Sequence, residues 1–295
     1  MLQSIAISAL VVIMMVTIGL ELTLEDLGNG LREGKWLVLA VLANVVLVPA
    51  LAYGLGLATA LPAGILLGAM VCASAPGGPT GPLFTRIAGA DLAFATALQV
   101  ILCVIGLVSA PLTLTLLLNH LGESEATRTS VAGTPLWPMV RTLFVFQLVP
   151  LATGMLVRRQ RPELAARMAK PMGTAANVLL LVIIVGMLAT RGKILLEQSL
   201  VVHGVLVAMV VLPLGLGRLS PSATEPQSKA MATAMVTTVR NLSVALLLSA
   251  TFFEDPAVDA AILVWGFYMM LLPAGVAALL GRRARRVDPA PAMAD

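Results

Sequence analysis

Residues 74–85 read S-A-P-G-G-P-T-G-P-L-F-T and interrupt an apolar segment that runs from about Leu61 to Leu92. Three prolines and three glycines fall within positions 76–82. Proline removes a backbone donor and crowds the preceding turn, and glycine leaves the backbone unrestrained, so a helix should not continue through them. In hydrocarbon, broken backbone survives only where it is packed in protein or lines a cavity. The stretch predicts a membrane helix broken at mid-span, which is typical of a transporter's substrate site. A re-entrant loop or two short helices joined by an ordinary turn is the alternative.

The rest of the chain is also typical of a membrane protein. Of its 295 residues, 59% are hydrophobic and 12% are charged. A spanning helix needs about 20 apolar residues, and nine such stretches are present, at about 2–20, 36–57, 62–86, 90–118, 135–158, 172–190, 199–217, 228–251 and 257–281. We therefore expect an all-α integral membrane protein with nine transmembrane helices. Residues 1–281 would form a single transmembrane transporter domain, and residues 282–295 a basic, then Pro/Ala-rich cytoplasmic tail.

Lysine and arginine are distributed unevenly between the joints of this predicted topology. If the N-terminus lies outside, the cytoplasmic joints and the tail hold fourteen basic residues, the outer joints three, and the spans two. Basic residues favour the cytoplasmic side. The pattern predicts a multi-pass protein of the cell inner (plasma) membrane, with the N-terminus outside and the C-terminus in the cytoplasm. No Lys or Arg precedes the first span, so we expect a retained helix and not a signal peptide.

A second unusual span covers residues 229–250, K-A-M-A-T-A-M-V-T-T-V-R-N-L-S-V-A-L-L-L-S-A, with Arg240 near its centre. A charge at mid-bilayer is disfavoured by at least about 3 kcal/mol on insertion scales, so it should face a cavity or a partner. No Asp or Glu lies inside any predicted span. The counter-charge should come from carbonyls, from the first broken helix or from an anionic ligand. A structural arginine that caps loose carbonyls is the alternative.

The predicted substrate site combines polar residues and glycines of these unusual spans. The candidates are Arg240, Asn241, Thr237, Thr238, Gly77, Gly78, Thr80, Gly81, Asn44 and Gln99, with Pro76, Pro79 and Pro82 as the helix-breaking residues. Asn44 and Gln99 are equally suited to hydrogen bonds with a neighbouring helix. The sequence contains no GxxxxGK[ST], GxGxxG, HExxH or GxSxG motif, so we predict no catalytic residue, metal or cofactor. Cys72 and Cys103 lie in apolar spans and are expected to be buried hydrophobes.

A faint internal repeat relates two proline-bearing spans. Residues 44–56 read N-V-V-L-V-P-A-L-A-Y-G-L-G, and residues 208–217 read A-M-V-V-L-P-L-G-L-G. Each segment is followed by a span of unusual polar content. Spans one to four therefore match spans six to nine, and span five has no partner. Because the two units would start on opposite sides of the membrane, they are expected to be inverted repeats.

At this point the chain resembles the bile acid:sodium symporter family, which also includes carriers of pyruvate, pantoate and other organic acids. The resemblance covers most of the chain and rests on the proline-bearing second span and on G-L-E-L-T-L-E-D-L (19–27), A-P-G-G with R-I-A-G-A-D-L-A (75–93), V-P-L-A-T-G-M-L-V-R-R (149–159) and R-N-L-S-V-A-L (240–246). It implies two inverted five-helix repeats whose broken fourth and ninth helices cross at mid-membrane. The chain is similar to a nine-helix version that lacks the first helix.

Most sodium ligands that the resemblance implies are replaced in this chain. The glutamate and glutamine of the ninth-helix pattern E-x-x-x-Q-N fall on Val236 and Arg240. The other replaced positions are Asn44 for a glutamine, Ala95 and Gln99 for a Ser and a Thr, and Pro79, Thr80, Gly81 and Pro82 for a polar run in the style T-A-S-N. We therefore hypothesise that Arg240 is a tethered replacement for sodium. Two sodium ions and one carboxylate sum to +1, as does Arg240 alone, and its guanidinium can bind a carboxylate through two hydrogen bonds.

The predicted function is transport of a small organic anion of the carboxylate type by alternating access, without sodium. A half-helix N-terminus at the 76–82 break would add a second positive pole. Uniport, exchange with a counter-anion and proton coupling are all left open. A sodium-coupled organic acid or bile acid symporter and a non-transporting membrane sensor are the alternatives. The expected partners are the anion and the lipid bilayer, without nucleic acid, and an enzyme is not expected because no nucleophile–base pair is apparent.

Overall fold

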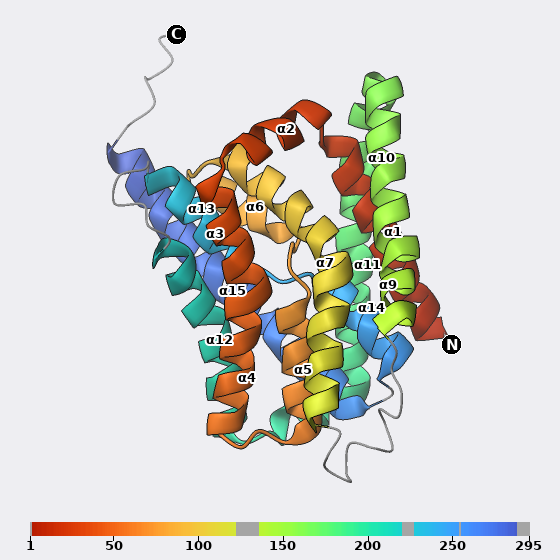
Figure 1. The fold of residues 1–295 in the computed structure, drawn as a ribbon, viewed down its shortest axis with the longest axis vertical. Helices are drawn as coiled ribbons and strands as arrows, with labels where there is room; N and C mark the ends of the chain where they lie inside the picture. The colour runs from red at the N-terminus through yellow and green to blue at the C-terminus, as the bar shows by residue number, and fades with distance from the viewer. Residues whose placement is uncertain (1, 122–135, 220–226, 254, 288–295) are drawn as a thin grey trace.

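The computed structural model describes residues 2–121, 136–219, 227–253 and 255–287, which are helical almost throughout and contain no β-strand. Figure 1 shows the arrangement. The helices are α1 (Leu2–Glu21), α2 (Leu24–Arg32), α3 (Lys35–Leu42), α4 (Val48–Ala58), α5 (Ala63–Ser74), α6 (Thr80–Ile87), α7 (Leu92–Leu121), α9 (Leu136–Leu143), α10 (Val149–Gln160), α11 (Pro162–Leu196), α12 (Leu200–Leu219), α13 (Gln227–Thr238), α14 (Leu242–Phe252) and α15 (Pro256–Val287). The π-helical segments η1 (Ala43–Leu47) and η2 (Phe144–Leu148) join α3 to α4 and α9 to α10.

The described helices are those of an integral membrane protein. Seven stretches are long and apolar enough to cross a bilayer, namely Ser4–Glu21, Trp36–Ala58, Leu92–His120, Leu136–Gln160, Pro162–Met187, Ser228–Phe252 and Pro256–Arg282. Two shorter apolar helices cover Ala63–Ser74 and Leu200–Gly215. The all-α membrane class is confirmed. Nine transmembrane helices in inverted repeats stay a prediction.

Some predicted joints are helical. The basic segment before the sixth predicted span belongs to α10 and α11, because α10 continues to Gln160 and α11 begins at Pro162. Proline is well tolerated at the first position of a helix, where its missing N–H would be unpaired in any case. Helix α15 likewise continues to Val287 and takes up the basic part of the predicted tail, while the Pro/Ala-rich residues 288–295 lie outside the described residues.

Helices α1, α10 and α11 pack against one another and form one side of the molecule (Figure 1). Glycines bring α1 and α10 into backbone contact. A Cβ atom on Gly19 would lie 2.3 Å from the carbonyl oxygen of Leu151, and one on Gly154 would lie 2.3 Å from that of Val16. Small residues of this kind let membrane helices approach closely enough for van der Waals contact along their backbones.

Helices from both halves of the chain surround the span formed by α13 and α14. This span is entirely buried inside the protein, whereas the span in α11 is 17% buried. Helix α13 packs against α6, α7, α12 and α15, and α14 packs against α1, α5 and α15. The polar and charged residues of the α13–α14 span are therefore surrounded by protein and not by lipid.

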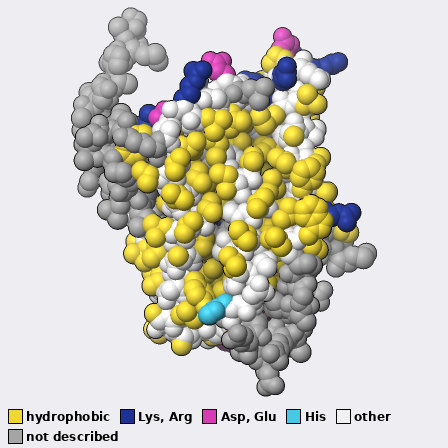
Figure 2. All heavy atoms as spheres, in the orientation of Figure 1, with side chains coloured by type: hydrophobic (Ala, Val, Ile, Leu, Met, Phe, Trp, Pro, Cys, Tyr) yellow, Lys and Arg dark blue, Asp and Glu magenta, His cyan; other side chains and the backbone are white. Residues whose placement is uncertain are grey.

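The visible surface has an apolar middle and one charged end. In Figure 2, hydrophobic side chains cover most of the middle of the face that is shown, and Lys, Arg, Asp and Glu side chains gather at the top. In Figure 1 the top carries α2 and the end of α10. This distribution is the one expected for a protein with an apolar belt in the bilayer and one strongly charged, water-facing end.

Candidate functional site

The first break is present but shorter than predicted, because Gly81 and Pro82 lie in the first turn of α6, where a proline is tolerated. Helix α5 ends at Ser74, α6 begins at Thr80, and the residues between them are not helical. Gly77 has a φ of +80°, in the region that favours glycine, and a Cβ atom there would lie 2.8 Å from the carbonyl oxygen of Gln99. The Cys103 thiol donates a hydrogen bond of 3.2 Å to the Gly77 carbonyl oxygen. The glycine is therefore required both for its backbone conformation and for close packing against α7.

A second break lies between Thr238 and Leu242, in a segment that contains no glycine or proline. Asn241 caps the new helix, because its Oδ1 accepts hydrogen bonds from the Val244 N–H at 3.2 Å and from the Ser243 hydroxyl at 2.8 Å. Side-chain oxygens of this kind replace the missing partners of the first turn of a helix. The candidate Asn241 is thus the residue that starts α14.

The two breaks cross in direct backbone contact. The Asn241 N–H donates a hydrogen bond of 2.8 Å to the Ala75 carbonyl oxygen. A Cβ atom on Gly78 would lie 2.4 Å from the carbonyl oxygen of Arg240. Irregular backbone at membrane depth requires partners within the protein, and here each break supplies part of what the other needs.

Arg240 lies at this crossing and is 1% exposed. Its Nη1 donates a hydrogen bond of 3.3 Å to the Asn44 carbonyl oxygen, and its backbone N–H contacts the Met269 sulfur at 2.9 Å. Asn44 belongs to η1, and π turns interrupt the regular hydrogen-bond ladder of a helix. The Asn44 side chain donates to the Ala40 carbonyl oxygen at 2.8 Å and to the Thr237 hydroxyl at 3.0 Å. The Asn44 carbonyl oxygen therefore balances part of the charge of Arg240, and carbonyls were one of the three sources of counter-charge expected from the sequence.

Several buried polar atoms of the two broken spans and their neighbours have no hydrogen-bond partner among the described residues. They are Arg240 Nε and Nη2, Asn44 Oδ1, Ser74 Oγ, Gln99 Nε2, Thr238 Oγ1 and Asn241 Nδ2. Buried polar groups are usually paired in native proteins. Four of these seven atoms are N–H donors, so this region has the capacity to bind an acceptor or a negatively charged group.

A cavity of about 470 Å³ separates α1 and α11 from α6 and α7. Its lining residues are Met14, Thr17, Ile18, Glu21, Pro79, Thr80, Pro82, Leu83, Arg86, Leu92, Thr96, Gln99, Gly173, Ala176 and Asn177. Of the predicted site residues, Pro79, Thr80, Pro82 and Gln99 line this cavity. The others are buried at or beside the crossing and outside the lining, namely Arg240, Asn241, Thr237, Thr238, Asn44, Gly77, Gly78, Gly81 and Pro76. The predicted residues thus divide between a cavity wall and a packed crossing.

Two charged residues of the cavity were not among the predicted site residues. Glu21 ends α1 and Arg86 lies in the last turn of α6, and both side chains are exposed in the lining of the cavity. In the sequence, both residues look like ordinary charges at helix ends. Only their place within the resemblance motifs that begin at positions 19 and 86 could have singled them out.

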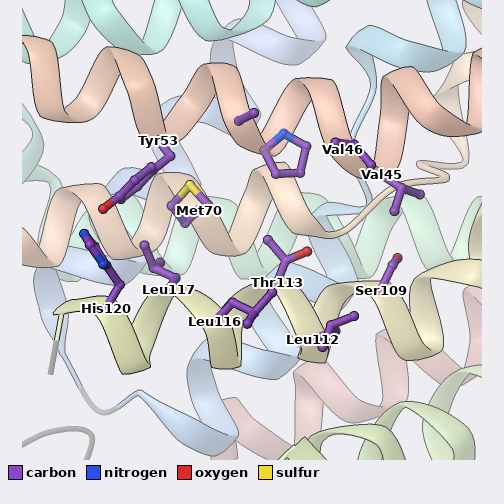
Figure 3. A pocket seen from close by; sticks show the side chains of 12 residues that line it. Val45, Val46, Tyr53, Met70, Ser109, Leu112, Thr113, Leu116, Leu117 and His120 are labelled. Atoms are coloured by element: carbon purple, nitrogen blue, oxygen red, sulfur yellow. The ribbon is translucent and has the colours of Figure 1, made fainter.

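A second cavity, of about 460 Å³, lies between η1, α4, α5 and α7 and is lined mainly by apolar side chains (Figure 3). At one end the rings of Tyr53 and His120 meet edge to face, with centroids 6.0 Å apart. Figure 3 shows these two rings on facing helices. None of the predicted site residues lines this cavity, and it does not touch the crossing residues.

The sequence pattern of the Sodium Bile acid symporter family matches residues 8–198. The chain is also similar to a protein of Bacillus subtilis (strain 168) described as "Uncharacterized sodium-dependent transporter YocS", with 26% identity over 212 residues. That match covers 70% of this chain and 60% of the relative, so the chain spans less than two thirds of the relative's length. The chain belongs to the sodium bile acid symporter family. By the family's description its members are symporters, which are membrane transporters.

Proposed function

We propose that the chain is a secondary transporter of a small organic anion, which works by alternating access and does not need sodium. In this proposal Arg240 holds the place of the coupling cation. The observation that carries it is a fixed guanidinium, 1% exposed, at the crossing of two broken helices. Such a crossing at mid-membrane is where secondary transporters bind substrate and ions. Family membership supports transport itself.

The charge around Arg240 supports an anion in preference to sodium. Val236, at the position that the resemblance assigns to a sodium-binding glutamate, packs against Gly81, whose Cβ atom would lie 3.1 Å from the Val236 Cα. Among the described residues one acidic side chain is buried, Asp259, and it accepts a hydrogen bond of 2.6 Å from Ser249, two turns beyond the crossing. Sodium requires several hard oxygen ligands, and a buried guanidinium disfavours a second cation beside it.

The cavity supports alternating access. It lies between α1 and α11 on one side and α6 and α7 on the other, and its wall includes Thr80 at the start of α6, just after the first break. The N-terminus of a half-helix is a positive pole for an anion. Because basic residues favour the cytoplasmic side, we propose that the cavity opens to the cytoplasm and that the N-terminus of the chain lies outside.

Two alternatives have specific support. The relative from Bacillus subtilis is described as sodium-dependent, which favours sodium coupling. The packed position of Arg240, outside the cavity lining, favours a non-transporting sensor that keeps the fold.

The test is uptake of labelled lactate, pyruvate and succinate into proteoliposomes, with and without an inward sodium gradient. It compares the wild type with Arg240→Gln and with the control Arg141→Gln, which removes an exposed arginine on α9. We expect saturable uptake of at least one acid that is indifferent to sodium, lost in Arg240→Gln and kept in the control. Uptake driven by sodium would support the symporter instead. No uptake of any acid by folded protein would support the sensor.

A further inference from the structure

We propose that Arg86 and Glu21 select monoanions in the cavity: Arg86 binds the carboxylate of the transported anion, and Glu21 excludes a second negative charge. The inference rests on the proposed function, because it names the charge class of the anion. It concerns residues that line the cavity, outside the crossing where Arg240 lies.

The two side chains come from different packed groups of helices. Glu21 lies at the end of α1, which packs on α10 and α11, and Arg86 lies on α6, which packs on α7, α13 and α15. Both side chains line the same cavity, and both are exposed. An arginine in the wall of a cavity can bind the carboxylate of an incoming anion, because its planar guanidinium binds carboxylates through paired hydrogen bonds.

The other lining residues supply no further charge. Apart from Glu21 and Arg86, the lining is made of apolar side chains, one glycine and the uncharged polar residues Thr17, Thr80, Thr96, Gln99 and Asn177. Asp91 starts α7 close by in sequence, but its carboxylate accepts a hydrogen bond of 2.9 Å from the Phe94 N–H and it does not line the cavity.

The formal charge of the site is balanced by one negative charge. Within the lining the charges of Glu21 and Arg86 cancel, and Arg240, which is buried outside the lining at the crossing, adds +1 to the protein around the cavity. A bound monoanion brings the sum to zero, whereas a dianion leaves −1 beside the Glu21 carboxylate. Like charges placed together in a binding site suppress the wrong partner. Removal of Glu21 should therefore admit dianions, and removal of Arg86 should weaken the binding of every carboxylate.

The experiment measures binding of 2-hydroxybutyrate and of malate, four-carbon acids that differ by the second carboxylate. Ligand-dependent shifts of the thermal unfolding midpoint are recorded for purified full-length protein in detergent. The variants are Glu21→Gln and Arg86→Gln, with Glu25→Gln and Arg141→Gln as controls that remove exposed charges of the same signs outside the lining. The midpoint without ligand shows whether each variant is folded.

We expect the wild type and both controls to bind 2-hydroxybutyrate at least about 10-fold more tightly than malate, because the second carboxylate of malate would lie beside the carboxylate of Glu21, and like charges repel. Glu21→Gln should remove this preference, and Arg86→Gln should weaken both acids by about 10-fold or more. Equal binding of both acids by the wild type, an unchanged preference in Glu21→Gln, or no binding of either acid would overturn the inference. If the protein binds with this selectivity but shows no uptake, the proposed transport is contradicted and the inference stands. If it shows sodium-indifferent uptake but no such selectivity, the inference is contradicted and the proposed transport stands.

Discussion

The N–H of Asn241 and the carbonyl oxygen of Ala75 form a hydrogen bond of 2.8 Å that joins the two breaks across the centre of the protein. Each partner belongs to a segment that has lost its helical hydrogen bonds. A backbone group left unpaired in an apolar environment is disfavoured by several kcal/mol. The two broken helices therefore stabilise each other, and the unusual backbone of one cannot be understood without the other.

The contact between Gly78 and Arg240 predicts a steric effect at the crossing. In Gly78→Ala the new methyl group would lie 2.4 Å from the Arg240 carbonyl oxygen, and both partners are backbone-fixed. We expect a loss of about 1–3 kcal/mol in stability, the usual range for overpacking, seen as a lower thermal unfolding midpoint in detergent. The control is Gly54→Ala, where nothing lies within 4 Å of the new Cβ; its midpoint should be unchanged or higher, because alanine favours helix. Equal midpoints for the two variants would refute the close approach.

The hydrogen bond from Asn44 to Thr237 predicts an energetic coupling between the π segment and α13. Both side chains are buried, and the bond is 3.0 Å long. A double-mutant cycle with Asn44→Ala and Thr237→Val should give a coupling energy of about 0.5–1.5 kcal/mol, the net contribution of a typical hydrogen bond. The reference cycle pairs Asn44→Ala with Thr59→Val, because the hydroxyl of Thr59, just after α4, donates to the Leu55 carbonyl oxygen four residues earlier. A coupling no larger than that of the reference would mean that the bond contributes nothing.

The glycine contact between α1 and α10 predicts that the cavity wall is sensitive to small changes. Gly19→Ala would place a methyl group 2.3 Å from the Leu151 carbonyl oxygen. Because backbone atoms cannot move aside without separating the helices, we expect a lower unfolding midpoint and weaker uptake. Gly204→Ala, where the new Cβ meets nothing within 4 Å, should leave both measurements unchanged. If Gly19→Ala behaves like this control, the two helices are not in backbone contact.

The sequence was sufficient to predict the first break but not the second without the family resemblance. Proline and glycine interrupt a helix through local sterics, which can be read residue by residue. The break after Thr238 contains neither. One group that stabilises it is local, the cap at Asn241, and the other, the Ala75 carbonyl oxygen, lies more than 160 positions away in the sequence. The π segment that presents the Asn44 carbonyl does have a local signal, because Pro49 follows it and cannot donate to the helical ladder, but the proline alone does not distinguish a π turn from a kink.

The candidate site was predicted in part for the same reason. Arg240 was noticeable because a charge at mid-membrane is disfavoured, and the structure buries it at the crossing. Glu21 and Arg86 stand at helix ends, where charge is ordinary, and only the packing of α1 and α11 against α6 and α7 places them in one cavity. The burial of Cys72 and Cys103 was expected, but the thiol bond to Gly77 depends on the crossing and was not.

Thiol labelling tests the proposed orientation of the cavity. Thr96→Cys places a thiol in the cavity wall, and Leu200→Cys places one at the start of α12, where the native side chain is 88% exposed. With the N-terminus outside, position 200 faces the exterior and the cavity faces the cytoplasm. A membrane-impermeant thiol reagent added to intact cells should therefore label Leu200→Cys and not Thr96→Cys. After permeabilisation it should label both.

The wild type serves as the control for this labelling. Cys72 and Cys103 are each 1% exposed, so the folded protein should stay unlabelled in either condition and the native cysteines need not be removed. Labelling of Thr96→Cys but not Leu200→Cys in intact cells would reverse the orientation. Labelling of both variants in intact cells would mean that the cavity is open to the exterior in the resting protein. The reagent cannot cross the bilayer, so it could reach position 96 only through the cavity.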